Sequence, residues 1–387
     1  MGSVLEELRN NINSGDMPSY IYGYPSKRTY STLEEGVDLK GIWKNTQGMV
    51  NIYIHIPFCN YKCSYCTLLM VNNGDDNLID TYVSTLINQI EMYGKIAGHL
   101  EVASIYFGGG TPTIMTDGQF DLIFDAIHKN FMKIGQDIEI SVEGSPETIT
   151  VDKLKHLKGL GVNRISVGIQ TLDPEELKKT GRGHSHLTSI RAINNIKEVG
   201  FTNFNLDLIY GLESQTTDNW ADILETVLSF NPKTISLYPI VIRDLTAIEK
   251  RKNNNDESFL DNGEKYNIYD FNVEFLEKYG YRQESLTRFT KFNGDSYAQE
   301  INDFDGMPLI GIGAGARSYS KDFHYSLDYA VLNSNKQEII NNFINGGWNQ
   351  LESTLHGMFL TSEEEKRRYI ILNLLVNKLN VEKANKK

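Results

Sequence analysis

From residue 51 onward, short runs of β-branched and aromatic residues alternate with longer stretches in which apolar residues recur every three or four positions. The short runs are typical of buried strands and the longer stretches of amphipathic helices. The predicted strands are 51–56, 104–107, 138–143, 164–170, 204–209 and 234–240. The predicted helices between them are 78–93, 117–130, 151–160, 187–199 and 220–230.

Strand–helix alternation of this kind favours an α/β fold, with a parallel sheet and right-handed crossovers. Six units are fewer than the eight of a complete TIM barrel, so we expect a partial (β/α)6 barrel. Residues 51–245 would form this barrel and residues 1–50 a lead-in segment. Residues 246–387 would form an α+β region that covers the barrel mouth. Ligands should gather at the carboxyl ends of the strands.

Composition and charge narrow the function classes. The 387 residues carry a formal net charge of −12, which argues against a nucleic-acid or anionic-membrane partner. There is no apolar run of about 18 residues and no signal-peptide pattern, so no membrane segment is expected. The few cysteines suit a reducing compartment, and a cytoplasmic location is expected.

All three cysteines, Cys59, Cys63 and Cys66, lie in one loop after the first predicted strand. Their C-x3-C-x2-C spacing can hold three irons of a [4Fe–4S] cube and leave the fourth iron open for chemistry. Free thiols or a zinc site are the alternatives. A structural zinc site normally closes with four ligands, and no C-x2-C or H-x3-H pattern elsewhere supplies the fourth. We therefore predict an iron–sulfur cluster.

The phrases around this loop resemble those of radical S-adenosylmethionine (SAM) enzymes. A glycine-rich stretch, Tyr106-Phe-Gly-Gly-Gly-Thr-Pro-Thr113, follows the second predicted strand. Three more phrases resemble the branch that includes the oxygen-independent coproporphyrinogen III oxidases: Tyr53-Ile-His-Ile-Pro-Phe-Cys59, Ser166-Val-Gly-Ile-Gln170 and Asn205-Leu-Asp-Leu-Ile-Tyr-Gly211. The resemblance runs from about residue 18 to residue 325 and also implies a partial (β/α)6 barrel.

The resemblance implies roles for residues near the cluster. The three cysteines would hold the cluster, and Tyr53 would contact SAM and take part in catalysis. Tyr65 would lie near the SAM adenine. Backbone groups of Gly109, Gly110 and Thr111 would hold the amino-acid end of SAM, because glycines leave room for close approach. Glu143 would face the SAM amine or ribose, since a carboxylate ending an apolar strand is costly unless it is paired.

Further along the chain, the resemblance implies a second SAM molecule beside the first. Gln170, Arg182 and Asp207 would surround it, and Ile209 would pack on an adenine. Arg182 can hold a carboxylate through paired hydrogen bonds. The cofactors expected are thus a [4Fe–4S] cluster and one or two SAM molecules, and a low-potential donor of the flavodoxin or ferredoxin type would supply electrons. The expected partner is a small-molecule substrate, and the protein would be a monomer.

Three chemistries are compatible with the resemblance, and all but the last begin with reductive cleavage of SAM to methionine and a 5′-deoxyadenosyl radical. The first expectation is transfer of a methyl or methylene group from the second SAM to an unsaturated carbon, as in class C radical SAM methyltransferases and cyclopropanases. The second is oxidative decarboxylation of coproporphyrinogen III. The oxidases carry a fourth cysteine where this chain has Leu68, and they continue for a further small domain. The third is a non-enzymatic heme chaperone, whose usual His-Asn-x-x-Tyr-Trp stretch is not found here.

Overall fold

The computed structural model describes residues 23–33, 37–72, 76–213, 215–243, 246–254, 259–292, 297–327, 336–376 and 378–386. Of the predicted lead-in, residues 1–22 and 34–36 lie outside this described part. Its described elements are the turn η1 (Lys27–Thr29), the strand β1 (Ser31–Leu33) and the helix α2 (Leu39–Asn45).

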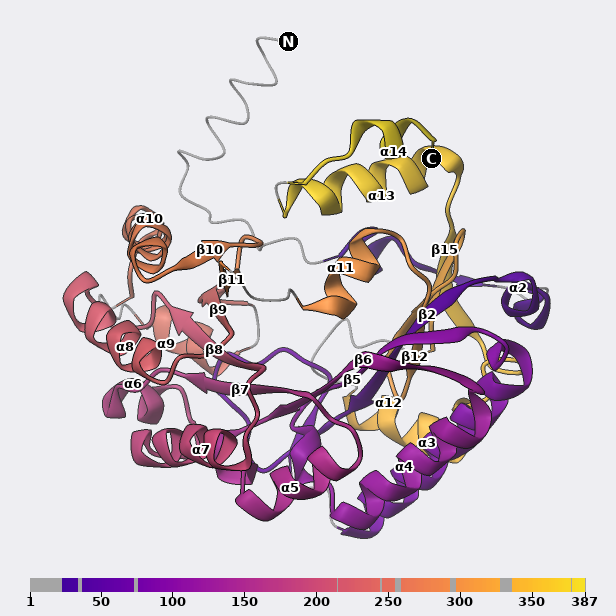
Figure 1. Ribbon diagram of the computed structural model, residues 1–387, viewed down its shortest axis with the longest axis horizontal. Helices are drawn as coiled ribbons and strands as arrows, with labels where there is room; N and C mark the ends of the chain where they lie inside the picture. Colours follow the sequence, from indigo (N-terminus) through magenta and orange to yellow (C-terminus); the bar gives the residue numbers. More distant parts are fainter. Residues whose placement is uncertain are drawn as a thin grey trace.

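All six predicted strands are present, side by side and parallel, with ends that differ by a few residues from the prediction. They are β2 (Met49–Ile56), β5 (Glu101–Gly109), β6 (Lys133–Gly144), β7 (Arg164–Gln170), β8 (Phe204–Tyr210) and β9 (Thr234–Pro239). Each strand pairs in parallel with the next one along the chain. Figure 1 shows this sheet strongly curved, with helices on its outer, convex side. The predicted α/β class and barrel-like architecture are confirmed.

The crossover helices include the five that were predicted and a short helix at residues 174–179 that was not predicted. Capping residues mark where several of them begin. They are α3 (Asp76–Ala97), α4 (Asp117–Asn130), α5 (Val151–Gly159), α6 (Pro174–Lys179), α7 (His186–Val199) and α8 (Thr217–Ser229). At the start of α4, Thr116 and Gln119 form a reciprocal capping box. Phe120 and Phe124 of α4 then pack on Phe107 of β5, with ring centroids 5.6 and 5.4 Å apart. Periodic apolar faces of this kind attach the helices to the sheet.

The region after residue 246 extends the same sheet at both edges. Its elements are α9 (Ala247–Lys252), α10 (Asn262–Lys278), β10 (Tyr281–Gln283), β11 (Arg288–Lys291), α11 (Ala298–Phe304), β12 (Leu309–Ile312), β13 (Arg317–Tyr319), β14 (Phe323–Ser326), α12 (Lys336–Asn342), η5 (Phe343–Gly347), β15 (Leu355–Phe359), α13 (Ser362–Leu374) and α14 (Val381–Lys386). The strand β12 pairs in parallel with β2, as a seventh parallel strand, and β11 pairs antiparallel with β9. The division at residues 50 and 245 stays a prediction.

The space between the two edges of the curved sheet holds α11 (Figure 1). The residue that precedes this helix, Tyr297, packs on Tyr106 of β5 with ring centroids 5.3 Å apart. Late-chain residues therefore help to fill the barrel interior. Among the helices of the described ranges, none has the length and apolar character needed to cross a membrane.

Candidate functional site

The cysteine loop leaves the end of β2 and is held by backbone hydrogen bonds. The short strands β3 (Phe58–Cys59) and β4 (Val71–Asn72) pair in parallel on either side of it. The Cys66 N–H donates to the Cys63 carbonyl at 3.1 Å, which turns the chain between the second and third cysteines. All three thiols are free, with Cys63 buried and the other two half-buried.

The thiols sit in an environment that can serve an iron–sulfur cluster. Arg182 donates from Nη1 to the Cys63 Sγ at 3.4 Å, and the Thr111 hydroxyl lies 3.4 Å from the Cys59 Sγ. Burial raises the pKa of the Cys59 thiol to about 12 and also raises the pKa of Cys66. Within the described residues, no three Cys, His, Asp or Glu side chains converge on a point suited to a single ion. A cube places each thiolate on a different iron, so its ligands need not converge in that way.

The glycine triplet is needed to bring the end of β5 against the cysteine loop. A Cβ at Gly110 would lie 2.5 Å from the Phe58 carbonyl oxygen and 3.0 Å from the Cys59 Sγ. Gly109 has a φ of +115°, and a Cβ there would meet the His55 ring at 2.6 Å. The N–H groups of Gly109, Gly110 and Thr111 all have acceptors within the chain. The carbonyl oxygens of this triplet are therefore the backbone groups best placed to bind the SAM amine, and the expectation that backbone groups here hold SAM stays a prediction.

Glu143, near the end of β6, lies beside this triplet. Its Oε1 accepts a hydrogen bond from the Tyr106 hydroxyl at 2.5 Å, and its Oε2 accepts one from the Gly109 N–H at 3.2 Å. Burial raises the pKa of Glu143 to about 7, against the lowering effect of the Tyr106 hydrogen bond. A buried carboxylate in this position is well suited to a cationic ligand, because a positive charge would favour its ionised form.

Tyr53, on β2, is fixed by a neighbour that the sequence did not single out. The Tyr53 hydroxyl lies 3.0 Å from His55 Nδ1, and His55 Nε2 lies 3.0 Å from the Leu69 carbonyl oxygen. A carbonyl only accepts, so Nε2 carries the proton and Nδ1 accepts from Tyr53. Burial lowers the pKa of His55 to about 4, which keeps the ring neutral. The sequence signal that could have identified His55 is its position two residues after Tyr53 in an otherwise apolar strand, which places both side chains on the same face of the sheet.

The three residues expected around a second SAM lie on or after adjacent strands and gather near Gly168. A Cβ built at Gly168 would lie 2.6 Å from Gln170 Nε2 and 3.6 Å from Arg182 Nη2. In the register of β7 and β8, Asp207 stands opposite Gly168. Gln170 has a φ of +64°, in the left-handed region that side chains other than glycine rarely adopt.

Each charged member of this group already has partners in the chain. Asp207 accepts hydrogen bonds from the Ser166 hydroxyl at 3.0 Å and from Asn205 Nδ2 at 2.8 Å. Burial raises the pKa of Asp207, and these two hydrogen bonds oppose the rise. Arg182 donates to the Gly168 carbonyl as well as to Cys63, and its buried Nε has no partner in the described structure. Arg182 thus lies directly against the cysteine loop, and its Nε–H is available to donate to a ligand.

Tyr65 and Ile209, both expected near an adenine, belong to one small apolar cluster. Ile209 is buried with Leu212, Ile240 and Ile248, and Tyr65 packs against this group. This group of apolar side chains is separate from the main hydrophobic core. An apolar surface beside the cysteine loop is the kind of wall on which an adenine ring can pack.

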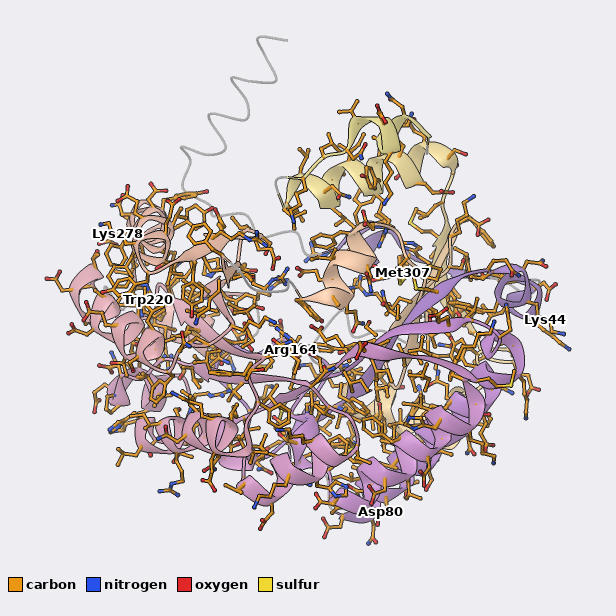
Figure 2. The ribbon with its side chains drawn as sticks, viewed as in Figure 1. Lys44, Asp80, Arg164, Trp220, Lys278 and Met307 are labelled. Carbon is orange, nitrogen blue, oxygen red and sulfur yellow. The ribbon has the colours of Figure 1, made fainter. Side chains whose placement is uncertain are left out.

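The barrel interior also holds a polar group that the sequence reading missed. Arg164 lies on the inner side of the curved sheet (Figure 2) and donates to the Ser141 hydroxyl at 3.1 Å. The guanidinium groups of Arg164 and Arg288 both contact the Tyr297 ring, at 4.6 and 5.3 Å from its centroid. Arg288 in turn pairs with Glu284 at 2.7 Å. Arg164 meets Tyr297 from a distant part of the sequence, so local patterns carried no signal for that contact.

Comparison with known proteins agrees with this geometry. Residues 53–227 match the family model of the Radical SAM superfamily. The heme chaperone HemW of Bacillus subtilis (strain 168) is 30% identical over 274 residues, which cover 70% of this chain and 71% of that protein. This chain belongs to the radical SAM superfamily. Within it, the oxygen-independent coproporphyrinogen III oxidase of Escherichia coli (strain K12) is 27% identical over 376 residues, covering 92% of this chain and 80% of the oxidase.

A solved structure supports the same placement of this radical SAM protein. The coproporphyrinogen III oxidase HemN from Escherichia coli has a TM-score of 0.82 to this chain and 25% sequence identity. The match covers 95% of this chain and 85% of the oxidase. The branch predicted from the sequence motifs is therefore confirmed, and a [4Fe–4S] cluster and SAM are its cofactors. These relatives are oxidases and heme chaperones, so they favour the second and third expected chemistries over methyl transfer.

Proposed function

We propose that this protein oxidises a carboxylated tetrapyrrole by radical SAM chemistry, in the manner of an oxygen-independent coproporphyrinogen III oxidase. The observation that carries the proposal is the extent of the likeness. The Escherichia coli oxidase aligns with 92% of this chain, and the HemN structure covers 95% of it. The likeness therefore includes the region from β10 to β15 as well as the barrel.

The residues of the site have distinct parts in this proposal. The thiolates of Cys59, Cys63 and Cys66 hold the cluster, with the Arg182 guanidinium against one of them. When bound, the cluster and SAM supply a carbon radical that can remove a hydrogen atom from the substrate. Glu143 offers a carboxylate to the SAM amine, and the Tyr65 and Ile209 side chains offer an apolar surface to its adenine.

A second group of polar residues lies on or just after β7 and β8. Gln170, Arg182 and Asp207 would bind a second SAM or a polar part of the substrate. A small donor protein of the flavodoxin or ferredoxin type would supply electrons. The position where the oxidases carry a fourth cysteine is Leu68, whose side chain is 56% exposed. In this chain, an exposed apolar side chain therefore stands two residues after Cys66.

The test is anaerobic reconstitution with iron and sulfide, followed by turnover with coproporphyrinogen III and methyl-deuterated SAM. A low-potential reductant supplies the electron that cleaves SAM, and an added one-electron acceptor takes up the electron that the substrate radical loses as carbon dioxide leaves. The proposal expects 5′-deoxyadenosine, methionine and carbon dioxide in amounts that depend on the tetrapyrrole. A variant with all three cysteines changed to alanine should form none of them. Absence of tetrapyrrole-dependent carbon dioxide from a protein that cleaves SAM would overturn the proposal.

Two alternative products are distinguishable in the same experiment. Methyl transfer would give S-adenosylhomocysteine and deuterium in 5′-deoxyadenosine, with no carbon dioxide. A heme chaperone is the second candidate function, supported by the 30% identity to HemW of Bacillus subtilis. It would bind heme stoichiometrically and leave coproporphyrinogen III unchanged.

A further inference from the structure

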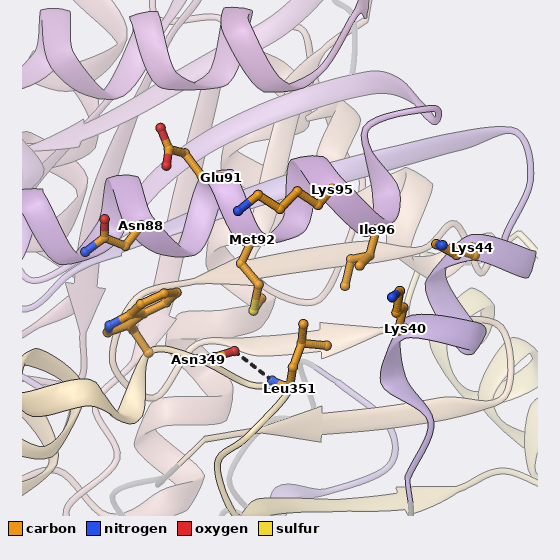
Figure 3. A pocket seen from close by; sticks show the side chains of 10 residues that line it. Lys40, Lys44, Asn88, Glu91, Met92, Lys95, Ile96, Asn349 and Leu351 are labelled. Carbon is orange, nitrogen blue, oxygen red and sulfur yellow. Dashed lines mark hydrogen bonds between the residues drawn. The ribbon is translucent and has the colours of Figure 1, made fainter.

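A cavity lies on the outer side of the barrel, away from the cysteine loop. Its volume is about 420 Å³, within the range of small-molecule sites. Its walls come from α2, from α3 and from the segment after η5 (Figure 3). The lining residues are Lys40, Lys44, Asn88, Glu91, Met92, Lys95, Ile96, Trp348, Asn349 and Leu351.

The cavity is remote from the radical chemistry. The helix α3 begins at Asp76, shortly after the cysteine loop, and ends at Ala97, shortly before β5. A helix of 22 residues is about 33 Å long. The α3 residues that line the cavity, from Asn88 to Ile96, belong to its second half. The cavity therefore lies toward the amino-terminal ends of the strands, opposite the cluster.

The charge of the cavity is opposite to that of the protein as a whole. Three exposed lysines, Lys40, Lys44 and Lys95, line it, and within the described chain none of them has an ion pair or side-chain hydrogen bond. Glu91 is the one carboxylate of the lining, and it forms an ion pair at 3.6 Å with Lys129, which does not line the cavity. A protein of net charge −12 thus presents three available cations around one hollow.

The floor of the cavity is apolar and includes an aromatic ring. Met92 and Ile96 are 5% and 3% exposed, and Leu351 and the half-buried Trp348 lie across from them. The side-chain amide of Asn349 is held by its own segment, since its Oδ1 accepts from the Leu351 N–H at 3.2 Å (Figure 3). A flat apolar body could pack on this floor while lysine ammonium groups meet its charged end.

A buried hydrogen-bond network holds the three walls together. Trp43 of α2 donates from Nε1 to the Tyr325 hydroxyl at 2.6 Å, and that hydroxyl lies 2.9 Å from the Tyr93 hydroxyl of α3. Tyr93 also donates to the side-chain oxygen of Gln350. Trp43 is next in sequence to Lys44 of the cavity, and Tyr93 is next to Met92. Gln350 lies between Asn349 and Leu351, which also line it. The cavity is therefore preformed, which lowers the entropic cost of binding.

We propose that this cavity is a binding site for an organic anion, with an apolar, preferably aromatic body and a carboxylate or phosphate group. The lysines select the negative charge, and Trp348 with Met92 and Ile96 selects the apolar body. Because the cavity is built on the outer face, the bound anion is neither the tetrapyrrole substrate nor SAM. The proposal does not depend on the reaction catalysed at the cluster.

The test uses the reconstituted holoprotein with SAM present, so that the barrel site is occupied. Titration calorimetry is performed with 2-naphthoate, 2-naphthyl phosphate and neutral 2-naphthalenemethanol. We expect the tighter-binding anion to bind at least tenfold more tightly than the neutral alcohol, and its identity separates a carboxylate site from a phosphate site. Changing Lys40, Lys44 and Lys95 together to glutamine should weaken anion binding at least fivefold, whereas Trp348→Ala should weaken all three probes.

A matched control keeps the change in net charge the same. Changing the exposed Lys133, Lys155 and Lys278 to glutamine should alter the anion dissociation constant less than twofold. Equal weakening by the two triple variants would overturn the proposal, because it would show an effect of overall charge alone. Equal affinity for the alcohol and the anions, or no binding of any probe, would also overturn it.

Discussion

The two halves of the barrel mouth are built in different ways. On the cluster side, at β2, β5 and β6, the glycine triplet and the cysteine loop contact each other through backbone groups. The Gly110 N–H donates to the Ile56 carbonyl, and the Thr111 N–H donates to the Phe58 carbonyl. At β7 and β8, here called the far side, long charged side chains make the contacts, and one of them, Arg182, extends to Cys63 of the cysteine loop. Backbone contact leaves no room to adjust, whereas side chains can move. The cluster side should therefore be sensitive to shape, and the far side should tune binding and electrostatics.

The largest effect is expected from adding one methyl group on the cluster side. Gly110→Ala would place a Cβ 2.5 Å from the Phe58 carbonyl oxygen, and this backbone cannot shift cheaply. We expect most of the cluster to be lost, measured as iron and sulfide content after reconstitution. Gly118→Ala is the matched control, because a Cβ at Gly118 meets nothing within 4 Å. Full cluster content in Gly110→Ala would remove the proposed contrast between the halves.

The next effect separates the two buried carboxylates. Glu143→Gln removes the charge beside the glycine triplet and should weaken binding of the first SAM by about 1–3 kcal/mol, roughly five- to 150-fold. Asp207→Asn should weaken that binding less, because Asp207 is held by Ser166 and Asn205 and acts on the first site only through its charge, which helps to raise the pKa of Glu143. Anaerobic equilibrium binding of SAM to both variants measures this. Equal losses would mean that one ligand contacts both carboxylates.

A smaller effect is expected on the reduction potential of the cluster. Reduction adds negative charge, and Arg182 places a cation and an N–H donor against a cluster thiolate. Arg182→Gln should therefore lower the potential by roughly 40 mV, equivalent to ~1 kcal/mol. Redox titration followed by electron paramagnetic resonance measures it. Arg251→Gln is the control, because Arg251 binds Glu213 at 2.7 Å rather than a sulfur. Similar shifts in both variants would contradict a specific role for Arg182.

The last effect concerns the pH dependence of stability. The pKa of Glu143 is raised to about 7 in the folded protein, from an ordinary value of 4.5. Between these values the folded state holds a proton that the unfolded state has released, so stability falls as pH rises through this window. Glu143→Gln should remove at most about 3 kcal/mol of this loss. Urea unfolding of the cluster-free protein at pH 5 and pH 8 tests it.

An exposed carboxylate provides the control for this measurement. Glu277→Gln changes the same chemical group at the surface and should keep the pH dependence of the parent protein. If Glu143→Gln and Glu277→Gln behave alike, burial of Glu143 does not govern the pH dependence.

Local patterns determined much of this protein. The predicted strand at residues 164–170 and the predicted helix at 117–130 coincide with β7 and α4, because periodicity and capping act over a few residues. The cysteine loop was also readable, since its three ligands lie within eight residues. The strand end then indicated Glu143, because all parallel strands present their carboxyl ends at one edge. Asp207, in the middle of its strand, was indicated by the family resemblance.

Only the tertiary structure decided the contacts between distant segments. It placed β12 beside β2 as a seventh parallel strand and set Arg182 against Cys63. It also brought Arg164 and Arg288 against the Tyr297 ring, and joined α2, α3 and the segment after η5 around a lysine-lined cavity. Such contacts depend on how whole elements pack, and the hydrophobic period of each element is the same whichever neighbour it meets. The chain's own pattern therefore specified the barrel and its cluster loop, while packing chose the partners of each charged side chain.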